Sequence, residues 1–389
     1  MAQTSEGKPK KMQKSASPTV AELRFMLYRI RRSPLSLVGV FIIVFFALIA
    51  ISAPIIAPRP AWDITATVDR GNPFLLPEYT GYSTPLPPSP TFPFGLTTYQ
   101  YDIYYACIWG TITAFRVGIT VVGLSLLIGL TIGILAGYYG GWIDEVLMRL
   151  TDVVFAFPGL VLAIVFVSVL PNTLIIGVAL ILPIIAVILS LITISNLAFS
   201  GARITSVRSL IWLIGTVVAI FLSVAVLARI LPNIGIGLGL AKLDKVLLAL
   251  TIVGWPGYTR VIRGEVLRTR TEDYIEAAKA SGCSDLRIMG RHILPNAIYP
   301  ILILASLDIG GVVLTAAALS FLGIGAPPNY ADWGQLVQKS ETYIGIAGEL
   351  GFYWYIWIIP GAFLFIFCLG WNLLGDAIRD ILDPTLRRR

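Results

Sequence analysis

The sequence predicts an all-α protein that crosses a membrane several times. Its 389 residues are 56% hydrophobic and only 13% charged, whereas a soluble domain has about 25% charged residues. Eight stretches are long enough for helices that span the hydrocarbon core, which takes about 20 mostly apolar residues. Together these observations exclude a soluble enzyme, a disordered protein and a small disulfide scaffold.

The eight expected spans follow one another along the whole chain. They cover residues 35–57, 109–137, 153–170, 173–195, 209–231, 245–262, 297–322 and 354–374. Residues 1–33 before the first span form a basic tail, and Lys and Arg are retained on the cytoplasmic side of membrane proteins. The arginine-rich segments after the second, fourth, sixth and eighth spans then fall on this same side. We therefore expect both termini to be cytoplasmic.

The segment between the first two spans is rich in proline. We expect a first transmembrane helix at 34–57 and an external segment at 58–107, with the remaining membrane domain at 108–389. Nine prolines lie in 58–107, and proline cannot donate to a helix or a sheet ladder. This pattern predicts an extended segment with little regular structure.

Glycine recurs at every fourth position of the second span, at Gly129, Gly133 and Gly137. Such a row lies on one helix face and lets a neighbouring backbone approach closely. Helix packing is the simpler interpretation, and a substrate path lined by these glycines is the alternative.

Residues 264–296 are predicted to form a helix–turn–helix elbow at the cytoplasmic membrane surface. Thr271 is the expected N-cap of its first arm, and Ala277 and Ala278 make that arm slender. Gly282 can adopt a left-handed conformation and end this arm. Ser284 is expected to cap the second arm, which would present Leu286, Met289 and Ile293 on one face and stop at Pro295.

This segment resembles the EAA loop of ABC importer permeases. Glu276-Ala277-Ala278, Gly282 and Leu294-Pro295 have the spacing of that loop, and residues 291–296 resemble the dipeptide/oligopeptide branch, in particular its C-type subunit. Further blocks match that branch in order, at residues 136–142, 147–152, 156–158, 255–258, 319–325, 333–334, 372–376 and 382–384.

The resemblance implies that the elbow docks onto ATP-binding subunits. The residues assigned to this contact are Glu276, Ala277, Ala278, Gly282, Ser284, Asp285, Arg287, Leu294 and Pro295. For Asp285 and Arg287, an ordinary solvated charge is the alternative.

The resemblance also implies an assembly in a prokaryotic cell membrane. Its other members are a second permease, two ATP-binding subunits and an external binding protein anchored to lipid or membrane. This chain has no Gly-x-x-x-x-Gly-Lys-Ser/Thr, the loop that cradles ATP phosphates. We therefore expect a transport subunit and no enzyme, with ATP and Mg²⁺ on the partners. No cofactor, metal or nucleic acid is expected on this chain.

The chain departs from the family at several places. The family core has six spans, so residues 173–243 are expected to add a two-helix hairpin at its periphery, for eight spans in total. The external motif Gly-Thr-Asp-x-x-Gly-Arg-Asp is Gly95-Leu-Thr-Thr-Tyr-Gln-Tyr-Asp102 here. Because such changes lie on the substrate side, the cargo stays open between di- or oligopeptides, oligosaccharides and nickel.

Two charged residues lie within apolar spans, at Asp308 and Arg116. Ionisable residues there are costly and usually face the bundle interior or a water-filled path. They are candidates for a translocation path, with a structural contact as the alternative for each. A gradient-driven secondary transporter is the more distant functional alternative, and a membrane enzyme is disfavoured by a single His292 and three scattered cysteines.

Overall fold

The computed structural model describes residues 33–59, 72–77, 79, 84–97, 100–170, 173–177, 235–239, 242–341 and 353–382. The chain divides into two compact units. One consists of Met1–Ile164 and Leu247–Arg389, and the other of Val165–Val246. Each unit is described by itself.

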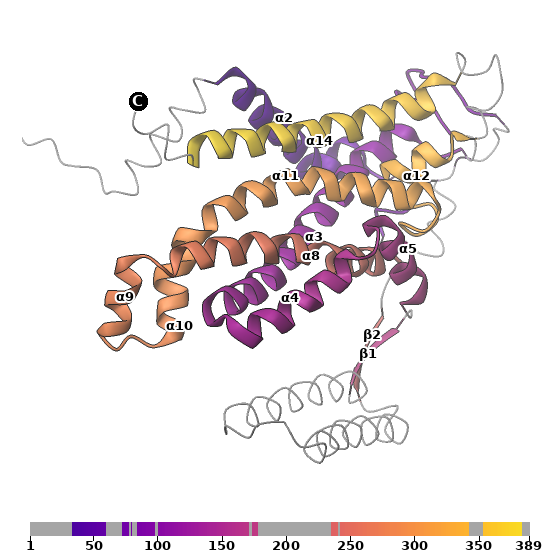
Figure 1. Cartoon of the computed structure of the whole chain (residues 1–389). Helices are drawn as coiled ribbons and strands as arrows, with labels where there is room; N and C mark the ends of the chain where they lie inside the picture. Colours follow the sequence, from indigo (N-terminus) through magenta and orange to yellow (C-terminus); the bar gives the residue numbers. More distant parts are fainter. Residues whose placement is uncertain are drawn as a thin grey trace, which may run out of the picture. The chain divides into compact units, whose positions relative to one another are not determined.

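The larger unit is built almost entirely from helices (Figure 1). In chain order they are α2 (Pro34–Ile56), α3 (Ile103–Tyr139), α4 (Gly141–Phe155), α5 (Gly159–Val169), α8 (Lys242–Thr269), α9 (Asp273–Ala280), α10 (Asp285–Ile288), the π-helical turn η2 (Met289–Ile293), α11 (Leu294–Phe321), α12 (Trp333–Gln338) and α14 (Trp354–Leu382). The last residues of α5 and the first of α8 belong to the smaller unit. The predominantly helical class is therefore confirmed.

Four described helices are long and apolar enough to cross a membrane. They are Pro34–Ile56, Ile103–Tyr139, Asp285–Phe321 and Trp354–Asp380. They correspond to the first, second, seventh and eighth expected spans. The sixth lies within α8, which is a helix but not one of these four.

The third expected span, 153–170, is wrong as a straight helix. The chain bends by 88° between α4 and α5, so these two helices form at most one broken span. The break falls at residues 156–158 and ends at Pro158. Proline has no N–H to donate and disfavours a helical conformation in the residue before it, which explains the interruption.

The fourth expected span, 173–195, does not begin as a helix. Residues Thr173–Gly177 form strand β1, which pairs antiparallel with β2, Gly235–Gly239. β1 carries two isoleucines, which favour strands, and β2 carries three glycines, which disfavour helix. The expected span at 209–231 lies outside the described residues.

Aromatic side chains make up much of one core of the larger unit. The Phe46 ring of α2 lies 5.4 Å from Phe367 of α14 and 6.0 Å from Trp333 of α12, measured between centroids. Edge-to-face contacts of this kind add to the free energy gained by burying the rings. They join α2, α12 and α14 around the start of α3.

The described part of the external segment contains two isolated β-bridges but no helix or strand up to Asp102. This agrees with the extended conformation expected there. The segment is nevertheless tied down, since Tyr105 donates a hydrogen bond to the carbonyl of Pro73 at 2.6 Å and Trp109 donates to Ala57 at 2.9 Å. α3 begins at Ile103, six residues before the expected 109, because the Asp102 carboxylate accepts the N–H groups of Tyr104 and Tyr105.

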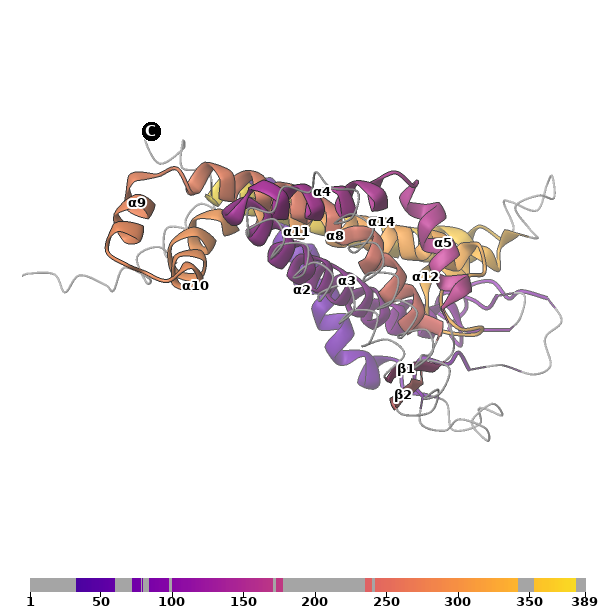
Figure 2. The ribbon, with the colours of Figure 1, turned by 60° about the horizontal axis from the view of Figure 1, so that its bottom comes forward.

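The elbow and α12 lie at opposite ends of the larger unit. In both views α9 and α10 project beyond one end of α8 and α11, and α12 lies toward the other end (Figures 1 and 2). The elbow is thus presented at a tip of the helical bundle.

Candidate functional site

The elbow consists of α9, α10 and η2, and it connects α8 to α11. In α9 only Ile275 is buried, and it packs in one cluster with Ile262 of α8 and Ile293 of η2. Ala277 and Ala280 are exposed. The first arm is therefore held by a single apolar anchor and presents a slender, open outer face.

The turn between the two arms is closed by Gly282 in a left-handed conformation, as predicted, with φ of 75°. The N–H of Gly282 donates to the carbonyl of Lys279 at 2.9 Å, and that of Cys283 donates to Ala278 at 3.1 Å. This pair of bonds is the Schellman arrangement that satisfies the last carbonyls of a helix. A side chain at position 282 would meet no atom within 4 Å, so the backbone conformation alone accounts for the glycine.

Two details of the helix caps differ from the prediction. Glu272, not Thr271, is the N-cap of α9, and the Thr271 hydroxyl donates back to the carbonyl of Arg268 at 2.8 Å. Threonine hydroxyls compete for nearby backbone groups in this way. Ser284 is the N-cap of α10 as expected, but its side chain makes no capping bond.

The second arm presents a different face from the one predicted. Met289 and Ile293 are buried, whereas Leu286 is 80% exposed and Ile288 takes the inner position. Residues 289–293 form a π-helical turn, which has more residues per turn than an α-helix and so shifts the register of the buried side chains.

The expected stop at Pro295 is also wrong. The helix runs without a break from Asp285 to Phe321, and Leu294 and Pro295 form the start of α11. A proline ring clashes with the carbonyl four residues before it. Arg291, four residues before Pro295, lies in the π-helical turn, and the wider turn there relieves that clash.

Polar contacts fix the elbow to the end of α3. The Tyr138 hydroxyl donates to the Asp285 carboxylate at 2.6 Å, and the Lys279 ammonium lies 5.6 Å from the Tyr138 ring. Arg270 donates to the carbonyls of Gly137 at 2.9 Å and Tyr138 at 3.4 Å. Asp285 is therefore more than a solvated charge.

A further contact closes the elbow on itself. The Asn296 amide donates to the Tyr274 hydroxyl at 3.2 Å and to the carbonyl of His292 at 2.7 Å. Tyr274 lies on α9 and Asn296 on α11, so this side chain joins the first arm to the helix that follows the second. The sequence prediction missed Tyr138, Arg270 and Asn296, because pairing across so many residues leaves no local pattern.

The glycine row of α3 packs directly against α8. A Cβ added at Gly129, Gly133 or Gly137 would lie 2.5–2.8 Å from the Cβ atoms of Tyr258, Ile262 and Val266, respectively. The helix-packing interpretation is thereby confirmed. Charge pairs then hold α4 to α8, since Arg263 binds the Asp144 carboxylate through two hydrogen bonds at 2.5 and 2.6 Å.

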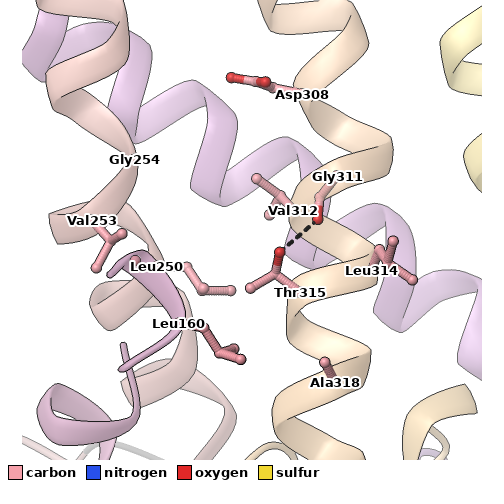
Figure 3. A pocket seen from close by; sticks show the side chains of 11 residues that line it. Leu160, Leu250, Val253, Gly254, Asp308, Gly311, Val312, Leu314, Thr315 and Ala318 are labelled. Atoms are coloured by element: carbon pink, nitrogen blue, oxygen red, sulfur yellow. Dashed lines mark hydrogen bonds between the residues drawn. The ribbon is translucent and has the colours of Figure 1, made fainter. Parts of the chain in front are cut away.

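A cavity of about 480 Å³ lies among the first residues of α5, the middle of α8 and α11 (Figure 3). Its walls are mostly apolar, with Leu160, Leu250, Val253 and Val312 among the lining residues. Asp308 is the only ionisable residue in the lining and projects from α11 toward α8. Arg116 is exposed and does not line the cavity, so the two intramembrane charges are not brought together there.

Near α12 a second acidic residue is buried outside the long apolar helices. The Asp332 carboxylate accepts the N–H of Gln335 at 2.9 Å as the N-cap of α12. Burial raises the pKa of Asp332 to about 6, and the hydrogen bonds to the carboxylate only partly offset this. The Gln335 amide in turn donates to the carbonyl of Pro327 at 2.6 Å, which ties down the loop after α11.

Comparisons with known proteins match most of the chain. A family model described as the binding-protein-dependent transport system inner membrane component matches residues 129–209 and 198–388. A model of the N-terminal transmembrane domain of oligopeptide transport permease C matches residues 23–77.

Curated relatives agree with these models. A dipeptide transport system permease protein of Alkalihalophilus pseudofirmus is 29% identical over 95% of this chain and 91% of its own length. A glutathione transport system permease protein of Pectobacterium atrosepticum is 31% identical over 77% of this chain and 75% of its own. An oligopeptide transport system permease protein of Bacillus subtilis is 26% identical over 93% and 89%. The chain therefore belongs to the binding-protein-dependent transport system inner membrane components, and within them to the dipeptide/oligopeptide group of ABC importer permeases that its motifs resemble.

Proposed function

We propose that this chain is one of two permease subunits of an importer that carries di- or oligopeptides across the inner membrane. The observation that supports a peptide cargo is the similarity over nearly the whole chain to permeases named for dipeptide and oligopeptide transport. Its partners would be a second permease, two ATP-binding subunits, which hydrolyse ATP, and an external binding protein that delivers the peptide.

The cargo is tested with the complete complex in proteoliposomes. We expect ATP-dependent uptake of a labelled tripeptide such as trialanine when the binding protein is supplied outside. Excess unlabelled oligosaccharide or Ni²⁺ should not compete. Uptake of either of those cargoes in place of the peptide would refute the peptide assignment and leave the importer architecture intact.

We propose that the elbow is the element that couples ATP hydrolysis to transport. Its exposed outer face, with Glu276, Ala277 and Ala280, lies at a tip of the bundle, and Leu286 of the second arm is also exposed. Small exposed side chains on the first arm and an exposed leucine on the second suit insertion into a groove on an ATP-binding subunit.

A pair of matched variants tests this coupling role. A Cβ atom added at Gly282 or Gly264 meets no atom within 4 Å, but of the two only Gly282 has a positive φ. A β-branched residue is disfavoured in that conformation by about 1–2 kcal/mol or more. We expect Gly282→Val to lose binding of the ATP-binding subunits or uptake, while Gly264→Val retains both and membrane insertion is unchanged in the two. Normal uptake by Gly282→Val would count against the elbow as the coupling element.

We also propose that residues 173–243 are an addition to a six-span core, giving eight spans with both termini and the elbow in the cytoplasm. Two observations support the addition. β1 and β2 pair near its two ends, so the two ends of the segment lie together, and the family model matches the chain in two pieces that overlap within it, at residues 198–209. Replacing residues 178–234 by a short Gly-Ser turn should leave assembly with the partners intact, and loss of assembly would refute the proposal.

The orientation is tested separately by labelling. In a variant without native cysteines, a single cysteine replacing the exposed Ser281 should react with an impermeant maleimide only after the cytoplasmic side is opened. Labelling of intact cells would place the elbow outside and overturn the topology.

A further inference from the structure

We propose that the cavity at Asp308 receives the cationic amino terminus of the peptide as it passes through the permease. The inference rests on the peptide cargo proposed above and adds a residue that contacts that cargo. The cavity volume of about 480 Å³ lies within the usual range of ligand pockets, about 300–1,000 Å³.

The cavity offers one charge and little else that is polar. The Thr315 hydroxyl, which also lines it, already donates to the carbonyl of Gly311 at 2.8 Å within α11 (Figure 3). Asp308 makes no ion pair with any Lys or Arg in the part of the chain that the structure describes. Its carboxylate is thus the polar group of the cavity that is left for a ligand.

A second polar group beside Asp308 is also incompletely satisfied. The Tyr258 hydroxyl is buried and has no hydrogen-bond partner among the described residues. The hydroxyl lies close enough to the Asp308 carboxylate for the two groups to interact, although not in the geometry of an ordinary hydrogen bond. Tyr258 is not among the residues that line the cavity, so the Asp308 carboxylate is the group that a ligand in the cavity can reach.

The charge of the cavity favours a cation over a neutral ligand. An ionised carboxylate among apolar walls is costly until an opposite charge reaches it. The amino terminus is a cation common to peptides of any sequence, so a contact with it does not depend on the side chains of the cargo. A neutral oligosaccharide has no such group, and the cavity offers a nickel ion only one ionisable ligand.

The first experiment compares two cargoes in the complete reconstituted importer. Trialanine and N-acetyl-trialanine differ in the terminal charge, and uptake of each is normalised to its occupancy on the binding protein, which is measured separately. We expect the wild-type complex to favour trialanine. Asp308→Asn removes the charge from the hydrogen bond to the amino terminus and should lower this preference for trialanine roughly tenfold. Asp308→Glu keeps the charge and should retain most of the preference.

The second experiment fills the cavity without changing Asp308. A Cβ atom added at Gly311, which lines the cavity, meets no atom within 4 Å, and the same is true of Gly361 in α14, which does not line it. We expect Gly311→Leu to lower uptake of trialanine more than that of dialanine, whereas Gly361→Leu should affect the two cargoes equally. This pair keeps the proposal testable should Asp308→Asn fail to assemble.

The outcomes separate this inference from the function on which it rests. Absence of ATP-dependent peptide uptake by the wild-type complex would refute the peptide cargo itself. Uptake with the same preference for the free amino terminus in wild type and Asp308→Asn would overturn the contact with Asp308 while the importer stands. Equal effects of Gly311→Leu and Gly361→Leu would show that the peptide does not enter the cavity.

Discussion

A methyl group added at Gly133 should force α3 and α8 apart, whereas the same change at Gly123 should not. Both glycines lie within α3, and replacing either by alanine raises helix propensity by about 1 kcal/mol. At Gly123 the new Cβ meets no atom within 4 Å, but at Gly133 it meets the Cβ and Cγ2 atoms of Ile262 and the carbonyl oxygen of Thr259, all at 2.8 Å. The two variants therefore differ in packing and not in propensity.

The size of the effect follows from these distances. Contacts at 2.8 Å must lengthen by about 0.6 Å to reach the ordinary range that begins at 3.4 Å. Because the Thr259 oxygen belongs to the backbone and Ile262 is fully buried, neither can move aside without α8. Overpacking of a close-packed interface costs about 1–3 kcal/mol. We expect Gly133→Ala to be less stable than Gly123→Ala by that amount.

The comparison is made by thermal unfolding of the purified complex in one detergent, with both variants and the wild type measured together. Gly123→Ala should melt at or above the wild-type temperature and Gly133→Ala below it. Equal shifts of the two variants in the same direction would refute the close approach of α3 and α8.

Three further predictions concern polar contacts. Tyr138→Phe removes the hydroxyl hydrogen-bonded to Asp285 at 2.6 Å and should destabilise the contact between the elbow and α3 by about 1 kcal/mol. Faster hydrogen–deuterium exchange confined to residues 282–290 would confirm this, and unchanged exchange would contradict it. Arg263→Gln breaks the two hydrogen bonds to Asp144 and should cost about 1–2 kcal/mol of stability, since the pair is only partly buried. A double-mutant cycle with Asp144→Asn, measured by thermal melts, should give a favourable coupling energy. Strict additivity of the two substitutions would contradict the ion pair. Burial raises the pKa of Asp332 to about 6, so the folded state binds the proton more tightly than the unfolded one. The contribution of this proton to stability should be fully present below about pH 4 and be lost, by about 3 kcal/mol, as pH rises from about 4 through 6. Asp332→Asn should remove this part of the pH dependence of the melting temperature, and a wild-type-like profile in that variant would refute the assignment.

Local patterns in the sequence predicted several parts of the site correctly. The row of Gly129, Gly133 and Gly137 indicated a close helix contact, because glycines at that spacing lie on one helix face and let a neighbouring backbone approach. Gly282 indicated a left-handed turn for a similar reason. Each of these follows from a residue that acts on its own backbone or on one face of its own helix.

The errors arose where a neighbouring segment decides the outcome. The short apolar run at 174–176 is compatible with a helix or a strand, and pairing with the distant Gly235–Gly239 selects the strand. Pro295 was expected to stop a helix, but the π-helical turn before it lets the chain continue into α11. The apolar run around Pro158 could likewise be read as one straight span, although the bend of 88° divides it.

The contacts of the elbow provide a route by which a movement of its tip is transmitted to the cavity. The elbow is fixed to α3 by Asp285 and Arg270, and α3 in turn packs on α8 without room for a methyl group. α8 and α3 should therefore move together, while the second arm continues into α11 as one helix. The cavity at Asp308 lies between α8 and α11, so a small rotation of one against the other changes its width. If the elbow couples ATP hydrolysis to transport as we propose, Gly282→Val should also abolish the preference for a free amino terminus that Asp308 is proposed to give. A Gly282→Val complex that retains slow uptake with the full preference would show that coupling at the elbow and recognition at Asp308 are independent.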